Sequence, residues 1–123
     1  MTIRRWGKYT VIWSRGSELK VKYIRVNPNS GLSFQKHTKR NELWFVVTGK
    51  ATIKTYGHIG AKAENVLIDK ISTDYREKHH FFYIHEQEWH QLINETNEPL
   101  IIIEIQFGKD CDEEDIERLF YYD

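Results

Sequence analysis

Residues 42–56 have the sequence ELWFVVTGKATIKTY. An apolar and aromatic run over residues 42–47 leads into Thr48-Gly49-Lys50, and apolar and polar residues then alternate over residues 51–56. Glycine adopts backbone angles that other residues avoid, so Gly49 suits a tight turn between two extended segments. This pattern predicts a β-hairpin of two antiparallel strands.

Similar segments occur on both sides of this stretch. They are rich in β-branched and aromatic residues and are bounded by turn-forming residues, such as those at positions 27–31. Charged residues at 76–78 indicate a further turn. Outside the first stretch we expect strands at residues 9–13, 19–26, 32–37, 65–72, 81–84, 89–93 and 99–107.

The end of the chain has a different pattern. Acidic residues crowd positions 110–115, and Ile116, Leu119 and Phe120 follow at helical spacing. Acidic side chains favour the first turn of a helix, so a short C-terminal helix is expected to pack on the sheet. Many short strands closed by one helix predict an all-β fold, an antiparallel β-barrel or sandwich, in a single domain over residues 1–123.

Composition excludes several classes of protein. The chain of 123 residues has 18 basic and 18 acidic side chains, so no net field would attract nucleic acid or an anionic membrane. The single Cys111 cannot form an intrachain disulfide, and no apolar signal segment begins the sequence. Apolar runs such as residues 100–103 are too short to cross a bilayer. We therefore expect a cytoplasmic protein without a membrane partner.

A compact set of nitrogen and oxygen donors stands out in the first half of the chain. Gln35 and His37 are two residues apart, so both face the same side of a strand, and Glu42 begins the next strand after a short turn. His90 would join them from another pair of strands. These donors suit one divalent ion among Zn, Mn, Fe, Co and Ni, although six histidines will also place one near a glutamate by chance.

Two motifs resemble those of cupins. The spacing Gln35-x-His37-x4-Glu42-x6-Gly49 resembles the first cupin motif, and His90-x3-Asn94 resembles the end of the second. More specifically, the chain resembles the cupin domain of type II mannose-6-phosphate isomerases along nearly its whole length. The segments that carry this resemblance are residues 5–9, 20–22, 32–37, 40–44, 103–108 and 113–118.

The resemblance implies a fold, an activity and a ligand set. The fold would be a cupin-type antiparallel β-barrel, also called a double-stranded β-helix or jelly roll. The activity would be the isomerisation of mannose 6-phosphate to fructose 6-phosphate, with Gln35, His37, Glu42 and His90 binding one divalent ion, Zn in the first place. The family's cupin often follows a nucleotidyltransferase domain, and only the isomerase part is expected in this chain.

Catalysis by this route also requires a side chain that binds the phosphate and a general base that transfers the proton. Arg118 lies where the resembled family has an arginine, and a guanidinium can fork onto phosphate oxygens, although a salt bridge to nearby acids would equally explain it. Candidates for the base are Lys20, Lys22, Glu104 and His85, which the sequence does not rank.

Other interpretations remain open at this stage. A cupin that binds a metal or a sugar without turnover is the main alternative, and a metal-dependent oxygenase fits less well because of the glutamine ligand. Lys39 would either contact an anion or be a solvated turn residue, and residues 57–80 could reshape the mouth of the pocket. Aromatic residues at Trp44, Phe45 and positions 120–122 are compatible with a homodimer.

Overall fold

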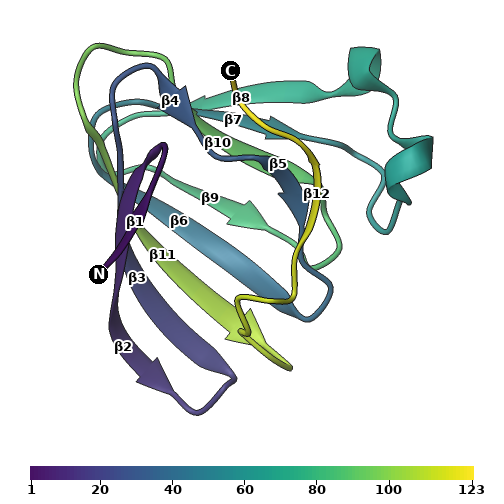
Figure 1. The fold of residues 1–123 in the computed structure, drawn as a ribbon, viewed down its shortest axis with the longest axis horizontal. Coiled ribbons are helices and arrows are strands. Elements are labelled where there is room, and N and C mark those ends of the chain that lie inside the picture. The colour runs from purple at the N-terminus through teal and green to yellow at the C-terminus, as the bar shows by residue number, and fades with distance from the viewer.

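Two antiparallel sheets of six strands each face one another in the computed structural model, which describes residues 1–123 (Figure 1). The first sheet has the order β1 (Thr2–Arg4), β2 (Gly7–Arg15), β3 (Leu19–Val26), β11 (Leu100–Gly108), β6 (Arg40–Thr48) and β9 (Phe81–Ile84). The second has the order β12 (Glu117–Phe120), β5 (Phe34–Lys36), β10 (His90–Asn94), β7 (Ala51–Thr55) and β8 (Ser72–Arg76), and β4 (Ser30–Gly31) also pairs with β10. The expected antiparallel all-β fold is confirmed.

The strands at residues 42–56 exist, but the predicted hairpin is wrong. β6 pairs with β11 and β9, whereas β7 pairs with β10 and β8, so the two strands belong to different sheets. Gly49 has a φ of +92°, and the connection around it carries the chain from one sheet to the other. Val46 before it and Ile53 after it therefore enter the same core cluster from opposite sheets and are not paired in one ladder of hydrogen bonds.

The inward-facing side chains change from apolar to polar along the three central strands of the first sheet. On β3, β11 and β6, inward side chains alternate with outward ones, as expected for strands. At one end the inward residues are apolar: Ile24, Val26, Val46, Leu100 and Ile102. Farther along the same strands they are polar but equally buried: Lys22, Glu42, Glu104 and Gln106.

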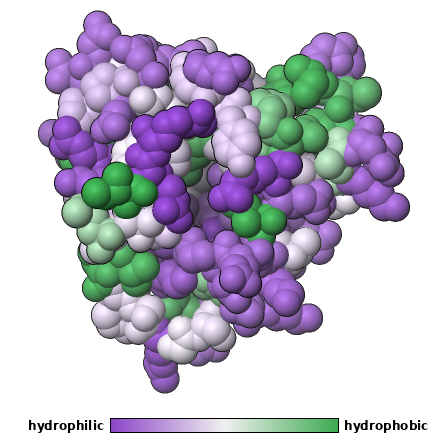
Figure 2. Space-filling view, in the orientation of Figure 1, coloured by the Kyte–Doolittle hydropathy of each residue, from purple (hydrophilic) through white to green (hydrophobic).

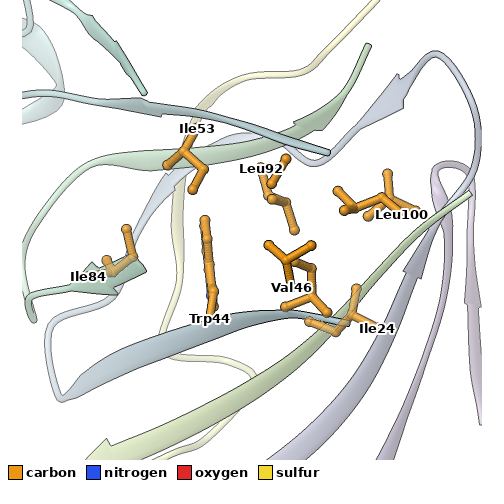
Figure 3. Close-up of a cluster of buried hydrophobic side chains, with 10 residues drawn as sticks. Ile24, Trp44, Val46, Ile53, Ile84, Leu92 and Leu100 are labelled. Atoms are coloured by element: carbon orange, nitrogen blue, oxygen red, sulfur yellow. The ribbon is translucent and has the colours of Figure 1, made fainter. Parts of the chain in front are cut away.

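The apolar end forms the main core. Ile53 and Leu92 from the second sheet point toward Trp44, Val46 and Ile24 from the first (Figure 3). All these side chains are at most 4% exposed, so this end of the sandwich is densely filled. Burial of this apolar surface is the main contribution to the stability of the fold.

Two parts of the predicted fold class are corrected. The two sheets share no hydrogen-bonded strands, so the structure is a two-layered sandwich and not a closed barrel. Residues 117–120 form strand β12, paired with β5, in place of the expected C-terminal helix. Phe120 stacks on Phe34 of β5 with ring centroids 5.0 Å apart, which anchors this last strand.

The acidic segment fails to start a helix because its carboxylates bind other parts of the chain. Glu113 forms ion pairs with Lys20 and Lys22 of β3. Asp115 accepts hydrogen bonds from the backbone N–H groups of Thr38 and Lys39. These long-range contacts hold residues 112–115 in turns across the ends of the strands.

Residues 57–80 also differ from the prediction. Two 3-10 turns, η1 (Ala63–Asn65) and η2 (Ile68–Lys70), replace most of the strand expected at residues 65–72, and β8 begins only at Ser72. Ala61, Ala63, Val66 and Ile71 pack against the buried cluster of Phe34, Tyr56 and Trp89. The connection projects beside the second sheet in Figure 1, and apolar side chains gather over that part of the surface in Figure 2.

The aromatic residues proposed for a dimer surface are not equivalent. Trp44 is only 2% exposed and belongs to the core, so it cannot contribute to an interface. Phe45 and Tyr121 do lie on the surface. No helix in the structure has the length and apolar character needed to span a membrane.

Candidate metal centre

A cavity of about 510 Å³ lies over the polar end of the sandwich. Its floor is formed by inward side chains of both sheets, and residues of β1 and β12, the first and last strands, also line it. Figure 2 shows a recess near the centre of this face, rimmed mainly by hydrophilic residues. The residues that line the cavity are Arg4, Arg5, Trp6, Tyr9, Lys22, Ile24, Leu32, Ser33, Gln35, His37, Arg40, Glu42, Trp44, His90, Leu92, Glu104, Gln106, Glu113, Ile116, Arg118 and Tyr121.

Three potential ligands converge on this floor. His37 follows β5, Glu42 lies on β6 and His90 begins β10, and one ligand atom of each lies within 4.8 Å of the others. His37 Nε2 is 3.3 Å from Glu42 Oε2, and His90 Nε2 is 3.7 Å from Glu42 Oε1. Ligands about 2.1 Å from one ion stand about 3.0–3.4 Å apart, so the separation of His37 from Glu42 fits a shared divalent cation, and His90 would have to approach Glu42 slightly more closely.

Backbone carbonyls fix the orientation of both imidazoles. Nδ1 of His37 is 2.7 Å from the carbonyl oxygen of Asp115, and Nδ1 of His90 is 2.8 Å from that of Glu88. A carbonyl can only accept, so Nδ1 of each ring carries a proton, and the atom that each neutral ring offers to an ion is Nε2, on the side of Glu42. This is the arrangement that supporting hydrogen bonds give to histidine ligands of metals.

Electrostatics keep His37 and Glu42 in the protonation states that metal binding requires. Burial, together with the neighbouring His90 and Arg40, lowers the pKa of His37 to about 3, so this ring is neutral at ordinary pH. Burial opposes ionisation of Glu42, but His90 and Arg40 hold its pKa below the ordinary value. A neutral imidazole and a carboxylate are both competent ligands.

Arg40 contacts the same atoms that an ion would use. Its Nε donates to Glu42 Oε2 at 3.0 Å, and its Nη2 lies 3.1 Å from His37 Nε2. Because that nitrogen has a single lone pair, it cannot accept from Arg40 and bind a cation at once. Metal binding at His37 therefore requires the Nη2 group to move away.

A second carboxyl lies beside the cluster. Trp44 Nε1 donates to both Glu42 Oε1 at 3.1 Å and Glu104 Oε2 at 2.9 Å, which holds the two carboxyl groups together. Gln106 Nε2 donates to the other oxygen of Glu104 at 2.5 Å. Burial and the charge of Glu42 raise the pKa of Glu104 to about 7.

Comparison with known proteins identifies the family. A family model described as "Mannose-6-phosphate isomerase C-terminal" matches residues 1–120. The chain belongs to this family. The resemblance to the cupin domain of type II mannose-6-phosphate isomerases is thereby confirmed.

Curated relatives of the chain are much longer than the chain itself. The alginate biosynthesis protein AlgA of Pseudomonas aeruginosa is 37% identical over 120 residues, which cover 94% of the chain and 21% of AlgA. A mannose-1-phosphate guanylyltransferase of Escherichia coli is 36% identical over 115 residues, with the same two coverages of 94% and 21%. The chain thus spans about a fifth of the length of these relatives.

Solved structures place the fold among cupins. The capsular polysaccharide assembling protein CapF of Staphylococcus aureus matches with a TM-score of 0.79 and 20% identity, over 98% of the chain and 32% of CapF. The Cnp3 cupin domain of Schizosaccharomyces pombe matches with a TM-score of 0.71 and 7% identity, over 89% of the chain and 69% of that domain. At these identities the likeness concerns the fold alone.

The remaining residues predicted for the site fall into two groups. Gln35 lines the cavity opposite His90 in the β5–β10 register, and its Nε2 donates to the carbonyl oxygen of Ser33. Its Oε1 is the amide atom left for an ion. Lys22, Glu104 and Arg118 also line the cavity.

Three other candidates lie elsewhere. Lys20 donates to the carbonyl oxygen of Cys111 at 2.7 Å and is not part of the cavity wall. His85 is exposed and packs edge-on against Tyr83, outside the cavity. Lys39 is also exposed and outside it, as expected for a solvated turn residue. No residue of 57–80 lines the cavity, so that segment does not shape its mouth.

Sequence reasoning gave no role to several residues that hold the site. Arg40 and Trp44 flank Glu42 at a spacing of two, and Gln106 follows Glu104 at the same spacing. Alternation along a strand places such residues on the same face, and this signal was available in the sequence. The contact of Asp115 with His37 spans 78 positions, and no local pattern marks it.

Proposed function

We propose that the chain is a metal-dependent sugar-phosphate isomerase that interconverts mannose 6-phosphate and fructose 6-phosphate. The observation that carries this proposal is the cluster of His37, Glu42 and His90 beside a second buried carboxyl, Glu104. Family membership supports the same activity, although the relatives are longer proteins.

The donor set fits a divalent ion, with Zn as our first choice and Mn, Co, Ni and Fe as alternatives. His37, Glu42 and His90 would hold it, and Gln35 would supply a fourth ligand through Oε1. Such an ion would stabilise negative charge that develops on the two reacting oxygens of the sugar.

Glu104 is our candidate for the base. The reaction moves a proton from C2 to C1 of the sugar, while the hydroxyl proton of O2 passes to O1, so no atom is gained or lost. A carboxyl with a pKa of about 7 can accept the carbon-bound proton and return it at neutral pH. Trp44 and Gln106 hold the two oxygens of Glu104 in place during this transfer.

Lys22 is a weaker candidate for the base because of its partner. Its ammonium group forms an ion pair with Glu113 and lies 4.2 Å from the centroid of the Tyr9 ring. An ammonium group held in these two contacts has no lone pair with which to accept a proton. We assign Lys22 the role of fixed positive charge in the cavity wall.

The test is an isomerase assay with defined metals. Purified protein is stripped with a chelator, reloaded with Zn, Mn, Co, Ni or Fe(II), and assayed with mannose 6-phosphate and with fructose 6-phosphate. Turnover is expected in both directions with at least one metal, and Glu104→Gln should lower kcat by about 100-fold or more. Glu64→Gln, on the exposed η1 turn, is the matched control.

Absence of turnover with every metal would refute the isomerase. A sugar-phosphate-binding cupin without catalysis is the second candidate function, and the hydrogen bond from Arg40 to His37 Nε2 favours it because it occupies a ligand lone pair. Calorimetric binding of mannose 6-phosphate without turnover or metal retention is the result expected for that function.

A further inference from the structure

Three arginines at the cavity lack acidic partners. Arg4 at the end of β1, Arg5 in the following turn and Arg118 of β12 all line the cavity. None of the ion pairs in the structure includes any of them, whereas Lys22 and Arg40 deeper in the cavity are paired with Glu113 and Glu42. Because arginine keeps its charge at any physiological pH, this set brings three positive charges without neutralising partners to one place.

Aromatic rings position two of these guanidinium groups. Arg4 Cζ lies 5.6 Å from the centroid of the Tyr9 ring, and Arg5 Cζ lies 5.5 Å from that of Tyr121. Contact with a ring orients the planar group and leaves its N–H edge available for hydrogen bonds. The hydrogen bond of Arg4 to the carbonyl oxygen of Ile3, at 3.5 Å, is too long to engage that edge strongly.

The register of the second sheet relates Arg118 to the metal cluster. Arg118 lies opposite Gln35 in the β12–β5 pairing, and Gln35 lies opposite His90 in the β5–β10 pairing. Residues in one such row face the same side of a sheet, so Arg118 and His90 are separated by two interstrand spacings, about 10 Å. That separation is comparable with the distance from C1 to the phosphate of an extended six-carbon sugar phosphate.

We propose that Arg4, Arg5 and Arg118 form a single subsite for the terminal phosphate of a six-carbon sugar phosphate. The phosphate dianion would bridge the first and last strands of the chain, with charge-assisted hydrogen bonds to each guanidinium. The position of the reacting carbons rests on the proposed function, but anion binding by the three arginines does not depend on it.

The geometry makes the subsite selective. A 6-phosphate reaches the arginines while C1 and C2 lie at the cluster of His37, Glu42 and His90. A 1-phosphate places its charge at the reacting end of the sugar, close to Glu42 and Glu104, and leaves the arginines unused. The subsite therefore selects for the distance between the phosphate and the reacting carbons.

The experiment is calorimetric titration of the full chain, loaded with Zn or with the metal that gives turnover. The probes are mannose 6-phosphate, mannose 1-phosphate and mannose, against the wild type, Arg4→Gln, Arg5→Gln and Arg118→Gln. Each variant is expected to bind mannose 6-phosphate about tenfold or more weakly, with unchanged binding of mannose. Arg15→Gln removes one exposed charge on β2 away from the cavity, and this matched control should change the affinity less than twofold.

The outcomes separate this subsite from the isomerase proposal. Weaker binding of mannose 6-phosphate in the three variants would uphold the subsite even if no metal gives turnover. Turnover with an unchanged KM in Arg4→Gln and Arg5→Gln would overturn the subsite and leave the isomerase intact. Equal losses for mannose and mannose 6-phosphate, or no preference of the wild type for the 6-phosphate, would also overturn it.

Discussion

Replacement of Glu104 by glutamine should stabilise the protein at alkaline pH. Glu104 is 6% exposed, and burial together with the charge of Glu42 raises its pKa from 4.5 to about 7. The folded state therefore binds the proton of this carboxyl more tightly than the unfolded state does. The resulting stability is fully present below pH 4.5 and is lost as the pH rises through 7. Complete ionisation lowers the free energy of unfolding by about 3 kcal/mol.

Glutamine can take the place of Glu104 without leaving more buried groups unpaired than the wild type already has. In the wild type, Trp44 Nε1 and Gln106 Nε2 both donate to the carboxyl oxygens of Glu104. Gln106 Oε1 is the buried side-chain atom that has no hydrogen-bond partner. If the Gln106 amide turns over, this oxygen accepts from the new amide group at position 104, whose own oxygen still accepts from Trp44. The variant thus removes the buried charge and keeps the network.

Urea denaturation at pH 5 and pH 8.5, with a chelator present, measures the effect. A chelator is needed because a cation bound to Glu42 would itself favour the charged form of Glu104. Between these two pH values the wild type should lose about 2 to 3 kcal/mol more stability than Glu104→Gln. Glu64→Gln should follow the wild type. An equal pH dependence in the wild type and Glu104→Gln would refute the conclusion that Glu104 is a desolvated carboxyl beside Glu42.

Two further predictions concern the metal cluster and its support. His37→Ala and His90→Ala should each abolish retention of a stoichiometric divalent ion, measured by elemental analysis after gel filtration. The control His58→Ala, at an exposed position, should retain the ion. Full metal occupancy in either ligand variant would show that the replaced histidine is not a ligand. Asp115→Ala removes the acceptor of the Thr38 and Lys39 backbone N–H groups, at 3.1 and 2.9 Å, and should lower the free energy of unfolding by about 1 to 2 kcal/mol. The substitution keeps the backbone carbonyl of Asp115 that orients His37, but it loosens the turn that positions this carbonyl, so metal binding should also weaken. An unchanged metal affinity would show that other contacts hold the turn.

Local periodicity was enough to predict most strands. Leu19–Val26 and Phe81–Ile84 were predicted with their observed bounds, since alternation and β-branched residues reflect the two faces of a strand. The pairing of strands was not predictable in the same way. Thr48-Gly49-Lys50 has the composition of a hairpin turn, and only the pairing of β6 with β11 and of β7 with β10 reveals that it joins two sheets.

The C-terminal segment illustrates a second limit of local patterns. Acidic residues before Ile116 match the start of a helix, but Glu113 and Asp115 instead bind residues more than 70 positions away. Such contacts satisfy the carboxylates and leave residues 117–120 free to pair with β5. Tertiary structure here overrides a helical preference that is weak over a segment this short.

The candidate metal ligands were easier to predict than the residues that hold them in place. Histidine and glutamate are typical metal ligands, whereas the supporting residues are not of types that mark a metal site. His37, which follows β5, comes together with Glu42 of β6 and His90 of β10 as a set of donors. Arg40, Trp44 and Gln106 also line the cavity, yet none of these residue types by itself marks a metal site. Their positions can be predicted only from strand alternation: residues two positions from the inward-facing Glu42 and Glu104 also face inward.

The same alternation explains why stability and activity should oppose each other in this protein. One sheet face continues from Val46 and Ile102, which stabilise the fold by burial, into Glu42 and Glu104, and the buried charge that Glu104 gains on ionisation destabilises it. Glu104→Gln is therefore expected to gain stability at pH 8.5 and to lose turnover in the isomerase assay. A variant that gained stability and kept full turnover would show that Glu104 is buried but is not the base, and the base would then have to be sought among the other residues of the cavity wall.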